Sequence, residues 1–169
     1  MAKFQFRGME EYAEYLQKIQ KNTPEILGKG VYEMAGVIAD EVKKNIEAIP
    51  SVDDTYNIIA YKKGTKSRLS HRQKEGLKDS FGIATMKYDD GYLNVKLGFD
   101  GYNSVETEKY PQGQPNALVA RSLESGTSYM DKVPFIRNAV NRKREDAITR
   151  AKLLIDEEIY AIEKGDFKK

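Results

Sequence analysis

Residues 116–140 of the chain read NALVARSLESGTSYMDKVPFIRNAV. A short apolar run ends at Gly126, and a second apolar pattern begins at Pro134. Proline suits the start of a helix, because the backbone N–H that it lacks would have no partner there. The stretch therefore predicts a short helix, a tight corner over residues 123–127 at which Gly126 adopts a positive φ, and a longer helix. We expect Glu124, in the corner, to cap a neighbouring backbone or to contact another subunit.

The longer helix is predicted from Pro134 to about Lys164, because its apolar residues recur near one stripe. They are Ile136, Val140, Ala147, Ala151, Leu154, Ile155, Ile159 and Ile162. The first half of this helix is basic, whereas the second half contains the acidic residues 156–158. Anions are preferred at helix starts, so this order opposes the helix macrodipole. We therefore expect a group outside the helix to offset it. Residues 165–169 are expected to be a frayed tail.

The N-terminal third of the chain predicts the spine of the domain. Residues 3–7 alternate as in a short strand, and a first helix follows from Met9 to about Lys21. Thr23 and Pro24 suit the cap and first turn of a new helix, which runs to about residue 49. Its apolar side is formed by Leu27, Val31, Met34, Ile38, Val42, Ile46 and Ile49. Three glycines indicate close packing of this helix against a neighbour: Gly28, Gly30 and Gly36.

Two alternating segments, residues 80–88 and 92–99, flank Asp90 and Gly91. An Asp-Gly pair between alternating segments is a strong signal for a two-residue β-hairpin turn. The predicted cross-strand pairs are Tyr88 with Leu93, Met86 with Val95, Ala84 with Leu97, and Gly82 with Phe99. We expect one face of the hairpin to cover a core. The residues expected to pack against the helix over residues 27–49 are Met86, Val95, Leu97 and Phe99, and those expected to face solvent include Thr85, Asn94 and Lys96.

The segment between the spine helix and the hairpin, residues 50–79, has the weakest pattern. Residues 56–61 are consistent with a short strand, and residues 62–78 are strongly basic with a single carboxylate, Glu75. The cations are Lys62, Lys63, Lys66, Arg68, Arg72, Lys74 and Lys78. An irregular connection of this length is uncommon in a compact domain unless it is functional or disordered. We interpret residues 50–79 as a mobile basic loop, whose seven cations contact DNA or a protein partner.

Length and composition bound the class of protein. The 169 residues suit a single domain over residues 1–169, and 40% hydrophobic with 32% charged residues is typical of a globular or assembly protein. No apolar run approaches the roughly 20 residues that span a bilayer, so we expect no membrane partner. The pattern of elements predicts an α+β fold: an antiparallel β-hairpin packed against a long central helix, plus a long C-terminal helix.

The residue types that carry catalysis are sparse. His71 is the only histidine, and Ser70 is poorly placed to pair with it because adjacent side chains normally diverge. We expect His71 to be a solvated loop residue. Residues 64–67, GTKS, lack the residue order of a phosphate-binding loop, and the acidic pairs lack the pattern of a calcium loop. The chain has no cysteine, so a thiolate metal site is excluded. Because the catalytic and ligand-binding patterns are also missing, we expect no enzyme activity, no metal and no cofactor.

Three short motifs occur in an order that spans much of the chain. Residues 76–80 read GLKDS, residues 123–128 read LESGTS, and residues 133–139 read VPFIRNA. In this order they resemble a family of neck and tail-completion proteins in long-tailed bacteriophages, with its "G-x-L-x-x-S" hairpin start, "LE-x-GT-S" corner and "PF-hydrophobic-R-x-A" helix start. The first motif departs from the family in that Gly76 and Leu77 are adjacent. The residues of the structural corner are Leu123, Glu124, Gly126, Thr127, Pro134 and Phe135.

This resemblance implies a structural role in the virion. A member of the family would form a homo-oligomeric ring in the neck or tail, between the portal or connector and the tail tube or tail terminator. It would assemble in the cytoplasm of the bacterial host and remain in the virion. DNA would pass through the ring, where the cations of residues 62–78 would offset phosphate charge without reading bases.

The residues by themselves leave a second class of function open. Seven cations in one segment could bind nucleic acid without sequence readout, with an affinity that falls as salt rises. In that alternative, residues 62–78 are the main site and not an incidental lining. A third class, a toxin or small hydrolase, lacks an acid–base constellation in the sequence.

Overall fold

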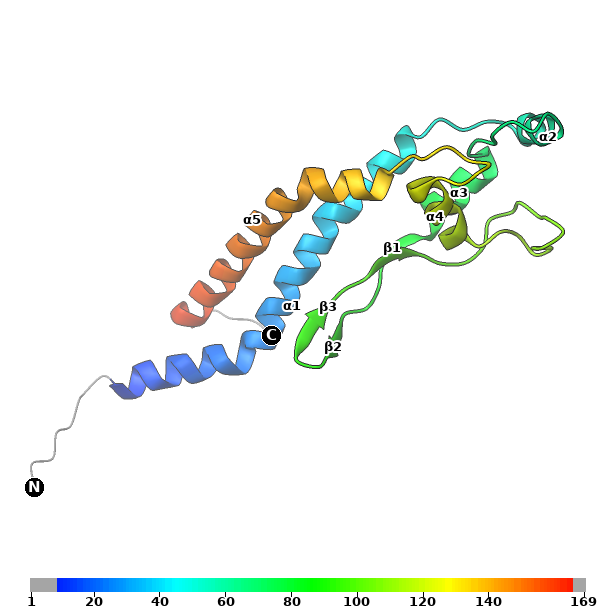
Figure 1. Cartoon of the computed structure of the whole chain (residues 1–169). Coiled ribbons are helices and arrows are strands. Elements are labelled where there is room, and N and C mark those ends of the chain that lie inside the picture. The colour runs from blue at the N-terminus through cyan, green and yellow to red at the C-terminus, as the bar shows by residue number, and fades with distance from the viewer. Residues whose placement is uncertain (1–8, 166–169) are drawn as a thin grey trace, which may run out of the picture.

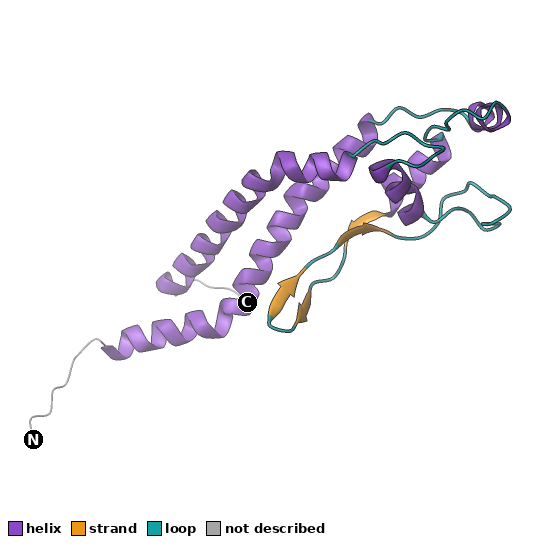
Figure 2. Cartoon of the chain, in the orientation of Figure 1, coloured by secondary structure: helices purple, strands orange, loops and turns teal. Residues whose placement is uncertain are grey.

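The computed structural model describes residues 9–165 and has an α+β fold, as the sequence predicts (Figure 1). The elements are α1 (Met9–Ala48), α2 (Asp54–Lys62), α3 (His71–Ser80), β1 (Phe81–Ile83), β2 (Lys87–Asp89), β3 (Tyr92–Asn94), β4 (Leu97–Phe99), α4 (Asn116–Ser125) and α5 (Phe135–Lys164). Helices dominate (Figure 2). The strands form two small antiparallel sheets, β1–β4 and β2–β3, which follow each other along one hairpin. The strand predicted over residues 3–7 and the tail after residue 165 lie outside the described residues.

The spine is one helix and not two. The predicted break at Pro24 is wrong, because α1 continues through this proline from Met9 to Ala48. Thr23 does not cap a new helix; its hydroxyl donates to the Ile19 carbonyl at 2.7 Å, within the same helix. Proline inside a helix removes one hydrogen bond and bends the axis. Figure 1 accordingly shows α1 bending near its N-terminal end, so that the first turns lead away from the rest of the chain.

The predicted C-terminal helix is confirmed as α5, which runs antiparallel to α1 along much of its length (Figure 1). Two of the three glycines on α1 mark close approaches. A Cβ on Gly30 would lie 2.9 Å from the Ile155 side chain on α5, and one on Gly28 would lie 3.1 Å from Met86. Gly36 has nothing within 4 Å of such a Cβ, so the same interpretation is wrong there.

The main core lies where the C-terminal half of α1 meets α3, α4, the β1–β4 pair and the start of α5. Its buried residues are Ala39, Val42, Ile46, Ile49, Leu69, Leu77, Phe81, Val119, Ala120, Leu123, Met130, Phe135 and Ala139. Three aromatic rings pack together between the hairpin and α5. The centre of the Phe99 ring lies 5.0 Å from the centre of the Phe81 ring and 6.1 Å from that of the Phe135 ring. This core is therefore built from segments that are far apart in the sequence.

The predicted hairpin forms, with its turn at Asp90 and Gly91. Near the turn, Tyr88 pairs with Leu93 as predicted, but further out the register is one residue off: Leu97 pairs with Ile83 and not with Ala84. The shift arises between the two ladders, where residues 84–86 lie opposite residues 95–96 only. An extra residue of this kind re-aims the strand.

The consequence of the shift is seen at the core. Phe81 pairs with Phe99 in place of Gly82, so a large ring fills the core position where the prediction placed no side chain. Met86 directs its N–H to the Tyr32 hydroxyl on α1 at 2.8 Å. The residues predicted to face α1 and the core are all half-buried: Met86, Val95, Leu97 and Phe99. Of those predicted to face solvent, Thr85 and Lys96 are exposed and Asn94 is half-buried.

The interpretation of residues 50–79 as an irregular loop is wrong. Residues 54–62, which include the predicted strand, form α2, and residues 71–80 form α3. The start of α3 is a capping box: the Ser70 side chain accepts from the Gln73 N–H at 3.2 Å, and the Gln73 side chain accepts from the Ser70 N–H at 3.0 Å. This spacing of serine and glutamine is a sequence signal for a helix start, which the excess of basic residues obscured.

Candidate functional site

The corner between α4 and α5 has the predicted geometry. Gly126 ends α4 with φ 73°, and its N–H donates to the Ser122 carbonyl at 2.9 Å. A Cβ on Gly126 would lie 3.0 Å from the Cβ of Lys132, so the corner is tight in space as well as in backbone conformation. Leu123 is buried in the core, and its carbonyl accepts from the Val133 N–H at 2.7 Å. The chain is thereby fixed on both sides of the turn.

Glu124 caps α5, as one of the two predicted roles requires. Its carboxylate oxygens accept from the backbone N–H groups of Ile136 at 2.9 Å and of Arg137 at 3.0 Å. These donors belong to the first turn of α5, where N–H groups have no partner within the helix. The negative charge of Glu124 also interacts favourably with the positive end of the helix macrodipole. Glu124 is therefore the group outside the helix that offsets its basic first half.

We expect Glu124→Ala to lower the free energy of unfolding by about 1 kcal/mol, because two N–H groups and the helix dipole lose their carboxylate. Urea unfolding followed by circular dichroism measures this loss. Glu145→Ala is the matched control, since Glu145 is an exposed residue of α5. Equal stabilities of the two variants would contradict the capping role.

The seven predicted cations do not form one loop. Lys62 ends α2, Lys63 follows it as the C-cap, Lys66 and Arg68 lie in the connection, and Arg72, Lys74 and Lys78 lie on α3. Four of them have partners within the chain. Lys66 pairs with Asp131 at 2.6 Å, Arg72 with Asp54 at 2.6 Å, and Lys78 with Glu47 at 3.8 Å. Lys74 donates to the carbonyls of Glu47 and Ile49 at the end of α1, each at 2.8 Å.

Three of the cations remain available at the α2 end of the molecule. Within residues 9–165, Lys62, Lys63 and Arg68 have no ion pair with a carboxylate. The Arg68 guanidinium instead lies over the Tyr56 ring, 5.5 Å from its centre, in a cation–π contact. The basic character predicted from the sequence is thus reduced to a smaller patch next to α2.

The α2 helix exposes most of its apolar residues. Ala60 is its one buried residue, whereas Tyr56, Ile58, Ile59 and Tyr61 are all exposed. Ile58 and Tyr61 border a groove of about 410 Å³ that also includes Val105, Tyr129 and Met130. We call this the α2 groove. Apolar surface of this kind marks contact sites on soluble proteins. The sequence interpretation missed it, because treating residues 56–61 as a strand left no helical face to examine.

His71 is not a plain loop residue, although it is exposed as expected. It begins α3, and its Nδ1 lies 2.7 Å from the Ser51 hydroxyl while its Nε2 lies 3.3 Å from Asp53. In the sequence, only the adjacent Ser70 was considered as a partner of His71. Ser51 and Asp53, which lie in the connection before α2, were missed. These contacts are exposed to water and are therefore weak. We interpret them as structural contacts that hold the connection before α2 against α3.

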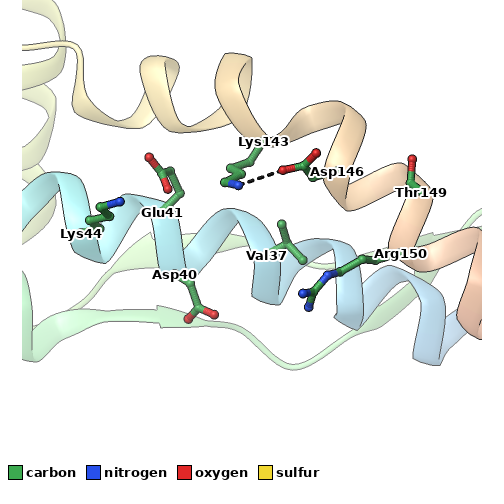
Figure 3. Close-up of a pocket in the computed structure, with 8 residues that line it drawn as sticks. All are labelled: Val37, Asp40, Glu41, Lys44, Lys143, Asp146, Thr149 and Arg150. Carbon is green, nitrogen blue, oxygen red and sulfur yellow. Dashed lines mark hydrogen bonds and ion pairs between the residues drawn. The ribbon is translucent and has the colours of Figure 1, made fainter.

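A second hollow lies between α1 and α5 and has a volume of about 450 Å³ (Figure 3). Its charged lining is balanced: Asp40, Glu41, Lys44, Lys143, Asp146 and Arg150. Lys143 donates to Asp146 at 2.8 Å, and this hydrogen bond raises the pKa of the lysine and lowers the pKa of the carboxyl. The lowered pKa means that the pair stabilises the fold above the ordinary carboxyl pKa and loses this effect as pH falls through the lowered value.

Further ion pairs cross the same helix pair. Lys29 on α1 contacts Glu158 on α5 at 3.0 Å, Arg150 contacts Glu33 at 3.4 Å, and Arg142 contacts the buried Glu41. The hydrogen bond to Glu158 raises the pKa of Lys29. Because opposite charges already face each other across the hollow, we interpret it as part of the α1–α5 interface and not as a ligand site.

No family model, no curated protein and no solved structure matches this chain. Among residues 9–165, no three histidine, cysteine, aspartate or glutamate side chains come together as a metal site would require. In the same part of the chain, every helix is too short or too polar to cross a bilayer.

Proposed function

We propose that the protein is a structural virion subunit that forms a ring in the neck or tail of a long-tailed bacteriophage, between the portal and the tail tube. The observation that carries this proposal is exposed apolar surface at both ends of an elongated chain. The α2 helix lies at one end and the first turns of α1 at the other (Figure 1). Large apolar side chains left in water favour a protein that is completed by its neighbours.

The positions of these surfaces support a ring. Two different surfaces at opposite ends suit a heterologous contact, in which one end of a subunit meets the other end of the next. Such contacts close into a ring when the rotation between subunits allows it.

The motifs that resemble the phage family hold structural positions in this chain. Gly76 lies against Asn103 and Asn116, Glu124 caps α5, and Phe135 is buried in the core. These roles support the proposal, because a resemblance confined to residues that set the fold is expected between proteins that share a fold.

The alternative, a nucleic-acid-binding protein that uses residues 62–78, gains less support. Four of its seven cations have partners within the chain, and Arg68 lies over a tyrosine ring. Fewer free cations mean fewer released counterions, and therefore a weaker and less salt-dependent affinity for DNA.

The test is electron microscopy of the concentrated protein and of virions from the phage or prophage that encodes it. We expect rings of the protein, and the same rings at the junction of head and tail. A protein that stays monomeric at high concentration and is absent from virions would overturn the proposal.

A triple variant separates the two functions. Lys62→Gln, Lys63→Gln and Arg68→Gln together should leave the circular dichroism spectrum unchanged, since these are surface cations, and should block virion assembly. In the alternative, the unchanged protein would bind a DNA duplex tightly as a monomer, and the triple variant would lose that binding. Duplex affinity measured at about 50 and 200 mM salt decides between them, because phosphate contacts weaken steeply over this range.

A further inference from the structure

The first turns of α1 form a helical arm that the other described residues leave exposed. Between residues 11 and 25 no side chain is buried, and the first buried residue is Ile26. Figure 1 shows this part of α1 leading away from α5 and from the hairpin. An isolated helix of this length is marginal in water, because its stability normally comes from packing of an apolar face. We call residues 11–22 the α1 arm.

The α1 arm has an apolar stripe suited to packing. Tyr12 is 56% exposed and Leu16 is 48% exposed, four residues apart and thus on one side of the helix. Tyr15 and Ile19 lie beside them and are only half-buried. An amphipathic helix with such anchors at intervals of three and four residues typically lies in an apolar groove of a partner.

The α2 groove at the other end of the molecule has a mixed lining, with apolar side chains on two sides. Its apolar lining includes Ile58, 55% exposed, and Tyr61, 85% exposed, both from α2. Tyr129 and Met130, from the corner before α5, line the other side. Tyr12 and Leu16 of an α1 arm would contact apolar side chains on both sides of this groove. The arm would in turn cover Tyr61 and Tyr129 of the groove.

The charges of the two surfaces are complementary. Glu11 and Glu14 lie at the start of the α1 arm and, within the described residues, have no ion pair. Glu10 precedes them in the sequence, and Lys18 and Lys21 follow further along the arm, so that its first turns are the acidic part.

Lys62, Lys63 and Arg68 border α2 and likewise lack a carboxylate partner in the described part of the chain. The groove also contains Glu106 and the paired Asp54 and Arg72, so that the net unpaired charge of the groove and these cations is positive. Complementary charges favour encounter and fix the orientation of an interface, whereas like charges exclude it.

We propose that the α1 arm of one copy binds in the α2 groove of the next copy, in a head-to-tail contact. The proposal rests on the proposed function, since it names the surfaces through which the ring subunits join. An antiparallel contact of two α1 arms would place Glu11 and Glu14 near Lys18 and Lys21 but would leave the α2 groove uncovered. A contact of two α2 grooves would bring their unpaired cations together and leave the arms uncovered. The heterologous arrangement brings the acidic start of the α1 arm to the cations beside α2 and covers both apolar surfaces in one contact.

Cysteine cross-linking tests this contact, because the natural chain has no cysteine. Leu16→Cys and Ile58→Cys are made as separate variants of the full chain, mixed at high concentration and oxidised. We expect a disulfide-linked dimer from the mixture and little from either variant alone. A chain that carries both cysteines should give a ladder of linked multimers. Tyr12→Cys replaces Leu16→Cys if the latter fails to fold by circular dichroism.

Leu153→Cys is the matched control, since Leu153 is an exposed leucine on α5, outside both surfaces. Mixed with Ile58→Cys, it should give no more dimer than random collision does. Reversing the charges of Glu11 and Glu14 to lysine should slow the Leu16→Cys reaction by about tenfold, which corresponds to roughly 1.4 kcal/mol of binding free energy. Adding Lys62→Glu and Lys63→Glu to the other partner should restore it.

The outcomes separate this contact from the proposed function. Rings in virions without the disulfide between residues 16 and 58 would overturn the contact and leave the neck function standing. The disulfide and its charge dependence, in a protein that is absent from virions, would leave the contact standing and overturn the neck function. Dimers from Leu16→Cys alone would show a symmetric contact and would overturn the head-to-tail arrangement.

Discussion

Leu123→Ala is expected to lower the free energy of unfolding by about 2–5 kcal/mol, the usual cost of a cavity left by a buried leucine. Leu123 is 2% exposed and belongs to the core that joins α1, α3 and α5. The Leu123 carbonyl also accepts a hydrogen bond from the Val133 N–H. Both the side chain and the backbone of Leu123 therefore fix the position of the corner. For a chain of this size each kcal/mol corresponds to roughly 2–4 °C in Tm.

Leu118→Ala provides the matched control for this loss. Leu118 lies in the same short helix, α4, but is 40% exposed, so its truncation leaves no closed cavity. We expect it to cost less than about 1 kcal/mol. Thermal and urea unfolding of both variants measure the difference. Similar losses for the two would mean that α4 is held by its helical propensity and not by the core.

Gly76→Ala is expected to lower the free energy of unfolding by about 1–3 kcal/mol, although alanine favours a helix over glycine by up to about 1 kcal/mol. The physical reason is space. A Cβ on Gly76 would lie 2.5 Å from the Cβ of Asn103 and 2.5 Å from Oδ1 of Asn116, which are both buried.

The two asparagines cannot easily move away. The Asn103 side chain donates to the Gln114 carbonyl at 2.9 Å, and the Asn116 side chain donates to the Asp100 carbonyl at 3.0 Å. Displacing either would leave buried polar groups without partners, which is costly. Gly76 thus holds α3 against the loop before α4, and this role gives the first of the three family-like motifs a structural basis.

Gly36→Ala is the control for this variant and should have the opposite sign. Gly36 lies within α1, and nothing lies within 4 Å of the position that its Cβ would occupy. The better propensity of alanine should therefore raise the free energy of unfolding by up to about 1 kcal/mol. If both glycine variants are more stable than the natural protein in urea unfolding, the close contact at Gly76 is not rigid.

The sequence by itself determined the features that depend on neighbours a few residues away. Helical periodicity predicted α5 almost to its ends, and the apolar run before Gly126 predicted α4 and its positive-φ corner. The Asp-Gly pair placed the hairpin turn, since only a few residue types accept the backbone angles required there. The position of Glu124 in the corner predicted either a cap on a neighbouring backbone or a subunit contact, and the structure shows the cap on α5.

The tertiary structure decided the features in which local preferences compete with packing. Residues 56–61 are rich in tyrosine and isoleucine, which favour strands, yet they form α2. The helix α1 passes through Pro24, where a break was predicted. The hairpin register shifts by one residue because the core is filled by the Phe81 ring and not by Gly82. At the hairpin the local preference is worth about 1 kcal/mol per residue, and packing of the Phe81 ring into a core built from distant segments can exceed it.

The candidate surfaces divide in the same way. Composition located the basic residues, but only the folded chain showed that Lys66, Arg72, Lys74 and Lys78 have partners on distant segments. It also brought Ser51 and Asp53 to His71 and left the apolar residues of α2 exposed. A sequence specifies which side chains carry charge, whereas pairing depends on which segments the fold brings within a few ångströms, because ionic contacts weaken rapidly with distance in water.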